Sequence, residues 1–213
     1  MICVIGNKLF IKLNIGNYID KFDKVVRCNM ALPVGHNGAK FGDLALCSHL
    51  YENLFLNKVS DEQFKTGYPK YKCEDVEYFL ENFDHNNFES CYYSKPDITK
   101  NNNFLRSIGC PHSFAKQPRT GYVEVMRHLM AGEDVAITHF TIINNEVRDS
   151  WYVKKNRGEN PKCHDGSSEI SILRWLHKND FVDASLCLLK DTEELEFYDK
   201  ELLPTNFMLD FIV

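Results

Sequence analysis

His164 is the residue of this sequence best suited to accept a proton. It lies in a short polar segment that leads directly into an apolar pattern with helical spacing. Asp165, Ser167 or Ser168 can cap the first turn of such a helix, which would fix the loop that carries His164. An imidazole on an exposed but anchored loop can act as a general base near neutral pH. A surface histidine before an ordinary helix is the alternative. The apolar positions of the pattern are Ile170, Leu173 and Leu176.

Polar side chains also follow two apolar runs near the N-terminus. Residues 2–5 predict a buried strand that ends at Gly6 and Asn7, and Val25 and Val26 predict a second buried strand. In an open α/β sheet, ligands bind at the carboxyl ends of the strands. Asn7 would then point its amide into that crevice, although an asparagine in a plain turn is the alternative.

Arg27 and Asn29 stand at the end of the second predicted strand. A guanidinium suits a phosphate, and an asparagine suits a base or ribose edge, so this pair is typical of a nucleotide site. The alternative is a structural Arg27 that pairs with Asp20 or Asp23.

Thr120 and Gly121 lie at the start of the clearest helical pattern, which begins at residues 118–121 and ends at Gly132. A strand is predicted at residues 134–138, so the unit is half of a right-handed α/β crossover. Free backbone N–H groups and the helix dipole favour an anion at such a helix start. The alternative is that Thr120 simply caps the helix, which needs no ligand and is compatible with an anion site.

The remaining elements are weaker in the sequence. A loop or lid connection is expected at residues 94–103, and the polar region after His139 holds Trp151 and Tyr152, which suit either a substrate lid or packing on the core. The C-terminal segment could pack on the core or contact a membrane or a partner. Strands are also predicted at 43–47, 90–93 and 183–189, and helices at 49–55 and 76–83.

Composition narrows the classes of function. The formal net charge is −5 and the sequence has no polybasic run, which argues against nucleic acid as a partner. No apolar run reaches the length of a membrane span, and no secretory signal is recognisable. The eight cysteines are scattered without a Cys-x-x-Cys pair. We therefore expect free thiols and a cytoplasmic protein.

Four segments in order resemble the motifs of sialyltransferases. Residues 4–7 and 22–29 resemble the opening of these enzymes, with a Gly-Asn turn after the first strand and an Arg-x-Asn after the second. Residues 118–121 are similar to their second nucleotide-binding motif, which has Thr-Gly or Ser-Gly at its core. Residues 163–169 are similar to their last motif, a histidine with a glutamate five positions on, and the helix and strand predicted after it also resemble the bacterial lipooligosaccharide sialyltransferases.

The resemblance implies a single α/β domain over residues 1–213, Rossmann-like in the GT-A-variant form, with a mostly parallel sheet flanked by helices. Lid or acceptor segments would lie around residues 94–117 and 140–162. The enzyme would move sialic acid from CMP-sialic acid to a glycan hydroxyl such as that of lipooligosaccharide or capsule, with inversion and without a metal or other cofactor. It would work in the cytoplasm or at the cytoplasmic face of a membrane, with peripheral association left open.

The resemblance also implies residue roles. His164 would be the general base, with Glu169 in support, and Tyr152 would contact the leaving phosphate from the lid. No Asp-x-Asp pair occurs in the sequence, which fits chemistry without a metal on the phosphate. The nucleotide-binding residues would be Asn7, Arg27, Asn29, Arg119, Thr120 and Gly121.

Departures from the family pattern keep alternatives open. Lys8 and Leu9 stand where the family carries further Gly and Ser. His139 stands near the position at which the bacterial members often carry an acidic residue. A CMP-Kdo-type transferase and a catalytically inactive nucleotide- or sugar-binding module are therefore the alternatives. An unrelated α/β enzyme with His164 and a Cys or Ser nucleophile ranks lower, because the sequence has no Gly-x-Ser-x-Gly elbow.

Overall fold

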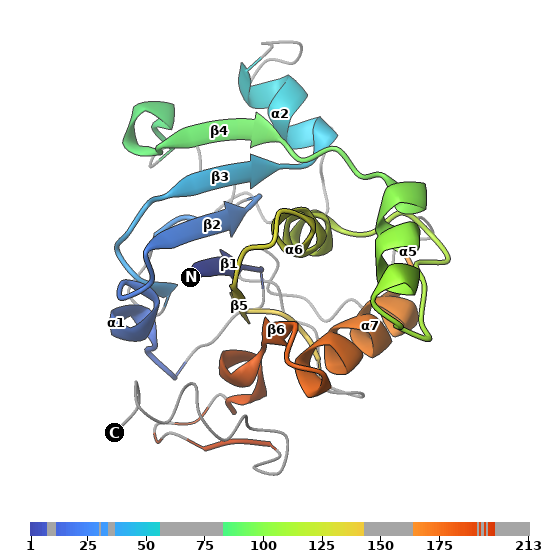
Figure 1. The fold of residues 1–213 in the computed structure, drawn as a ribbon. Helices are drawn as coiled ribbons and strands as arrows, with labels where there is room; N and C mark the ends of the chain where they lie inside the picture. Colours follow the sequence, from blue (N-terminus) through green and yellow to red (C-terminus); the bar gives the residue numbers. More distant parts are fainter. Residues whose placement is uncertain are drawn as a thin grey trace.

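A parallel sheet forms the centre of the fold. The structure, a computed structural model, describes residues 1–7, 12–29, 31–33, 37–55, 83–142, 164–190, 192, 194 and 196–198. Six strands pair in the order β4-β3-β2-β1-β5-β6, and every pair is parallel (Figure 1). They are β1 (Ile2–Ile5), β2 (Lys24–Cys28), β3 (Asp43–Leu46), β4 (Ser90–Tyr93), β5 (Val135–Thr138) and β6 (Val182–Asp183). The predicted Rossmann-like α/β fold is confirmed.

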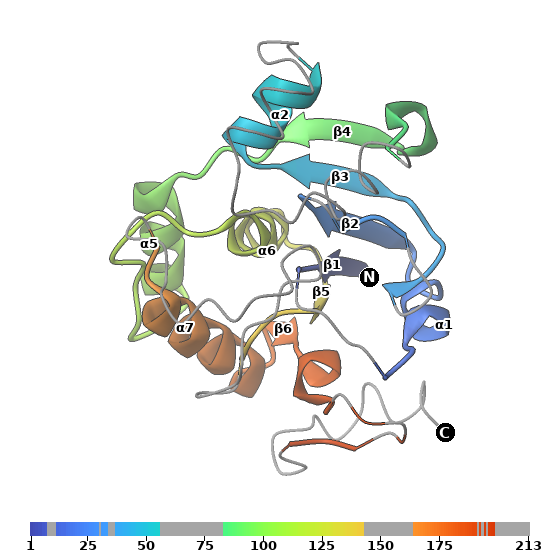
Figure 2. The same ribbon diagram turned by 180° about the vertical axis from the view of Figure 1, so that it is seen from behind.

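Helices cover both faces of this sheet. Figures 1 and 2 show α6 (Thr120–Met130) between the sheet and α5 (Ile98–Ser107), with α7 (Gly166–Lys178) beside them. The opposite face packs against α1 (Gly16–Ile19) and the 3₁₀ helix η3 (Ser185–Leu188). A further helix, α2 (Ser48–Phe55), follows β3, and a 3₁₀ helix, η2 (His85–Asn87), precedes β4.

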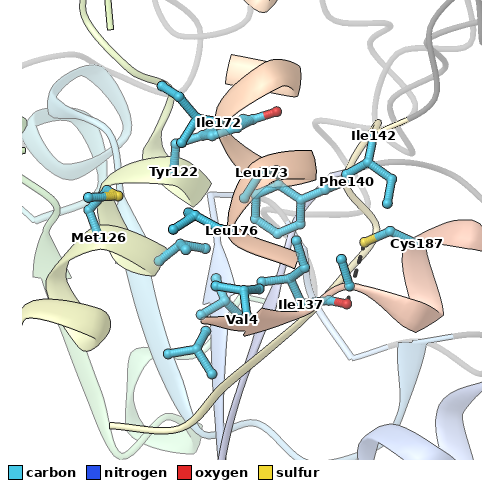
Figure 3. Close-up of a cluster of buried hydrophobic side chains, with 14 of the residues drawn as sticks. Val4, Tyr122, Met126, Ile137, Phe140, Ile142, Ile172, Leu173, Leu176 and Cys187 are labelled. Carbon is cyan, nitrogen blue, oxygen red and sulfur yellow. Dashed lines mark hydrogen bonds between the residues drawn. The ribbon is translucent and has the colours of Figure 1, made fainter. Parts of the chain in front are cut away.

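The alternation of side chains along β1 builds two apolar cores. Val4 lies in the cluster that α6 and α7 cover, whereas Cys3 and Ile5 lie in the cluster on the other face. Because both faces are buried, the strand is apolar at every position, as parallel sheets require. Figure 3 shows the first cluster, in which side chains of β1, β5, α6 and α7 meet.

Most predicted elements agree with the structure, and α7 begins as expected. The Asp165 carboxylate accepts hydrogen bonds from the backbone N–H groups of Ser167 and Ser168, at 3.1 and 3.4 Å. Asp165 is therefore the N-cap of α7, and it fixes the loop immediately before the helix.

The prediction of a loop at residues 94–103 holds for residues 94–97 and is wrong from Ile98 on, where α5 begins. Asp97 caps α5 by accepting from the Lys100 N–H at 2.9 Å, and Leu105 is fully buried. The run of asparagines suggested a loop, but one of them, Asn102, makes a tertiary contact. The Asn102 side chain accepts from the Phe114 N–H at 2.8 Å and donates to the Phe114 carbonyl at 3.0 Å.

The prediction of a strand at residues 183–189 is correct only at Asp183, because a 3₁₀ helix follows at Ser185–Leu188. The Asp183 carboxylate accepts from the backbone N–H and the hydroxyl of Ser185, at 2.8 and 2.6 Å. This local side-chain turn ends β6 and directs the chain into η3, where the apolar run is buried as a 3₁₀ helix.

Several predictions fall wholly or mostly outside the described residues: the helix at 76–83, the lid segment beyond residue 142, Tyr152 and the C-terminal segment. The cysteines inside the described ranges are free, which confirms that part of the thiol prediction. No helix in those ranges combines the length and apolarity that crossing a bilayer requires.

Candidate functional site

The order of the strands reverses beside β1, and this marks a ligand-binding edge. From β1 the chain extends the sheet through β2, β3 and β4 on one side, and later through β5 and β6 on the other. Open α/β sheets bind ligands outside the carboxyl ends of the strands at such a switch point. The residues that follow β1, β2 and β5 therefore form the first candidate site.

Asn7 and Asn29 follow β1 and β2 at matched positions. Ile5 pairs with Arg27 in the parallel register, and Asn7 and Asn29 each follow two residues after that pair. The Asn7 Oδ1 atom is buried, and nothing in the described ranges donates a hydrogen bond to it. A buried acceptor without a donor costs about 1–3 kcal/mol, so this oxygen needs a water or a ligand.

Asn29 connects three elements at this edge. Its Oδ1 atom accepts from the Cys47 N–H at 2.8 Å and from the Thr120 hydroxyl at 3.4 Å, which joins β2 to β3 and α6. Its backbone is left-handed, with a φ of 56°, a conformation that asparagine tolerates better than most residues. With the oxygen fixed in this way, the amide nitrogen is oriented as a hydrogen-bond donor.

His164 is fixed by one backbone contact. Its Nδ1 atom lies 2.6 Å from the carbonyl oxygen of Gln117, which can only accept a hydrogen bond. Nδ1 therefore carries the proton, and Nε2 keeps its lone pair. Burial lowers the pKa of His164 below its ordinary value, and Arg119 lowers it further, although the Gln117 hydrogen bond opposes them. The imidazole is thus neutral at pH 7 and able to accept a proton at Nε2.

Glu169 binds the start of α6 from outside the helix. The Glu169 carboxylate is buried, accepts from the Arg119 N–H at 2.8 Å and pairs with the Arg119 guanidinium at 2.8 Å. Arg119 is the N-cap position of α6, but its own side chain makes no cap hydrogen bond. The alternative that Thr120 serves simply as the N-cap is therefore wrong, because Glu169 of α7 accepts from the N-cap N–H and the Thr120 hydroxyl contacts Asn29.

Arg27 does not lie in the crevice, so its predicted contact with the nucleotide is corrected. The side chain has no exposed surface. Its guanidinium donates to the carbonyl groups of Ala31, Asn37, Gly38 and Lys40, at 2.6–3.3 Å. It also donates to the Asn37 side-chain oxygen at 3.0 Å. Arg27 therefore holds the segment between β2 and β3, and neither suggested aspartate is its hydrogen-bonding partner.

Gly121 is required by packing. A Cβ atom at this position would lie 2.6 Å from the Phe140 ring. We expect Gly121→Ala to lower the free energy of unfolding by about 1–3 kcal/mol, because overpacking outweighs the gain in helix propensity. Urea unfolding measures the change, with Asn103→Ala on the exposed side of α5 as the control. An unchanged midpoint for Gly121→Ala would contradict the close contact.

The structure brings most of the predicted residues into one connected group. Asn29 contacts Thr120, Arg119 is bound by Glu169, and His164 is held by Gln117 directly before them. Tyr152 lies outside the described residues. The Gln117 contact was missed because a backbone carbonyl makes it, and no side-chain type signals such a role.

The described ranges hold no cluster of His, Cys, Asp and Glu side chains arranged to bind a metal ion. Comparison with known proteins adds no identification. A scan against protein-family models finds no match for the chain, and a search of curated proteins finds none.

Proposed function

We propose that the protein is an inverting glycosyltransferase that needs no metal and moves sialic acid, or a related CMP-activated sugar, to a glycan hydroxyl. One observation carries the proposal. The Nδ1 proton of His164 is bound by the Gln117 carbonyl at 2.6 Å, so Nε2 keeps its lone pair while the ring is held against the segment that leads into α6. Three of the four segments that resemble the sialyltransferases, at residues 22–29, 118–121 and 163–169, are joined by the contacts of Asn29 with Thr120 and of Arg119 with Glu169.

The chemistry assigns one step to His164. The acceptor hydroxyl oxygen attacks the anomeric carbon, and Nε2 of His164 takes the hydroxyl proton. The bond between the anomeric carbon and the phosphate oxygen breaks, and its electron pair leaves with CMP. Attack opposite the leaving group inverts the anomeric centre. A general base of this kind contributes about 10²- to 10⁴-fold to the rate.

The nucleotide would be bound at the switch point. Asn7 offers a buried acceptor, and Asn29 offers an oriented amide donor. Thr120 and Gly121 are the first residues of α6, whose early N–H groups have no partner within the helix. These N–H groups and the helix dipole favour a phosphate, and they would stabilise the charge that develops on departing CMP.

Two measurements test the function. In a thermal-shift experiment, CMP should raise the melting temperature more than UDP at equal concentration, because a ligand that binds only the folded state stabilises it. The protein incubated with CMP-sialic acid and a mixed glycan acceptor should then release CMP. Binding without release would support an inactive module, and release from CMP-Kdo alone would identify the other donor.

The pH dependence of transfer follows from the lowered pKa of His164. The neutral imidazole is the active form, so the rate should rise with pH through a midpoint below 6.5 and stay level from pH 7 to 8. The measurement is kcat/KM for CMP-sialic acid over pH 5–8. His164→Ala should abolish this rising limb, and a midpoint above pH 7 would contradict the assignment.

A further inference from the structure

We infer that a cavity at the carboxyl end of β4 binds the acceptor, and that this acceptor is a negatively charged glycan; the inference rests on the proposed function. The cavity has a volume of about 320 Å³, within the range of small-ligand sites. It lies at the same edge of the sheet as the switch point, because β4 is parallel to the other strands. Its lining residues are Tyr93, Lys95, Pro96, Ile98 and Gln117.

Gln117 connects this cavity to the proposed base. Gln117 lines the cavity, and its carbonyl oxygen accepts a hydrogen bond from Nδ1 of His164 at 2.6 Å. Three residues further along the chain, Thr120 contacts Asn29 at the end of β2. The short segment from Gln117 to Thr120 therefore joins the cavity to the proposed nucleotide residues. Neighbouring strands are about 4.8 Å apart, so the ends of β2 and β4 are about 10 Å apart, which suits two adjoining substrates.

The side chains at the cavity suit a charged sugar. Tyr93 exposes 38% of its surface, whereas most large hydrophobic residues in the described ranges are less exposed. An aromatic ring of this kind can stack on the apolar face of a sugar. Lys95 is exposed, and none of the ion pairs between described residues involves it. In a protein with a net charge of −5, an ammonium group at a cavity is a local site for a carboxylate, sulfate or phosphate.

The walls of the cavity are fixed from behind. Glu124 of α6 is fully buried and accepts hydrogen bonds from the hydroxyl groups of Tyr92 and Ser94, on both sides of Tyr93. Arg127 pairs with the same carboxylate at 2.8 Å. The Asp97 cap fixes the start of α5, which supplies Ile98. These contacts fix the residues on both sides of Tyr93 and the start of α5, so we expect a low entropic cost of ordering this wall on binding.

The test measures the binding of lactose and of sulfated lactose by saturation-transfer NMR titration, with CMP present. Sulfated lactose carries a negative charge but no sialic acid, so the donor site does not select it. The wild-type protein should bind sulfated lactose about tenfold more tightly than lactose, and Lys95→Gln should remove this difference. Tyr93→Ala should weaken both sugars. Lys100→Gln is the control, because Lys100 is exposed on α5 and does not line the cavity.

The two proposals can fail separately. Equal binding of both sugars by the wild-type protein, or unchanged selectivity in Lys95→Gln, overturns the inference, while the CMP shift and CMP release still report on the proposed function. If CMP neither binds nor is released, the proposed function fails. A charge preference that depends on Lys95 would then still establish this cavity as a glycan site, although not as an acceptor site.

Discussion

Replacing His164 by alanine will lower the rate of sugar transfer by about 10²- to 10⁴-fold and leave the affinity for CMP nearly unchanged. The imidazole is bound through Nδ1 to the Gln117 carbonyl, so its other nitrogen, Nε2, keeps the lone pair that can accept a proton. Alanine removes the proton acceptor, but it leaves Asn29 and Thr120 in contact with each other. Transfer is measured as CMP release that depends on acceptor, and CMP affinity by calorimetry.

Two variants make this prediction specific. His112→Ala removes an exposed histidine from another loop and should transfer at the wild-type rate. His164→Gln keeps a polar side chain of similar reach but cannot take the proton, so it should be about as slow as His164→Ala. Normal transfer by His164→Ala would rule out His164 as the base.

Replacing Arg27 by methionine will destabilise the fold by about 3–5 kcal/mol, because it leaves several buried carbonyl groups without a donor. Burial lowers the pKa of Arg27 to about 10, so the guanidinium is still charged at pH 7. It binds four main-chain carbonyls between β2 and β3. Chemical denaturation measures the loss, and Arg106→Met on α5 is the control, because Arg106 is exposed.

A second substitution separates the structural role of Arg27 from a ligand contact. Arg27→Lys keeps the charge but has no planar fork of donors, so its stability should lie between those of the wild type and Arg27→Met. A variant that folds with normal stability and loses only its affinity for CMP would support the nucleotide contact that the sequence motif implies, and would contradict the structural role.

The sequence predicts the sheet well, because buried parallel strands are short apolar runs that periodicity reveals. It also predicts the start of α7, since the cap of Asp165 is a local contact. The helix α5 was missed because its run of asparagines resembles a loop, whereas Asn102 binds Phe114 further along the chain. Local patterns carry little information about such tertiary contacts.

The sequence identified most of the residues that meet at the candidate site, but it assigned some of them the wrong role. Asn29, Thr120 and His164 come together, whereas Arg27 turns away from the crevice into the protein. The function of Glu169 as a cap for α6 depends on a partner 50 residues away in the sequence. No spacing rule within one motif can reveal a contact between two motifs.

The two contacts between residues 117–119 and residues 164–169 run in the same order along both segments. Gln117 meets His164, and Arg119 meets Glu169. One added residue in either segment would let only one of these contacts form again. Insertions or deletions in these two segments should therefore lower stability far more than point substitutions do. An insertion that one segment tolerates should be matched by a compensating insertion in the other segment.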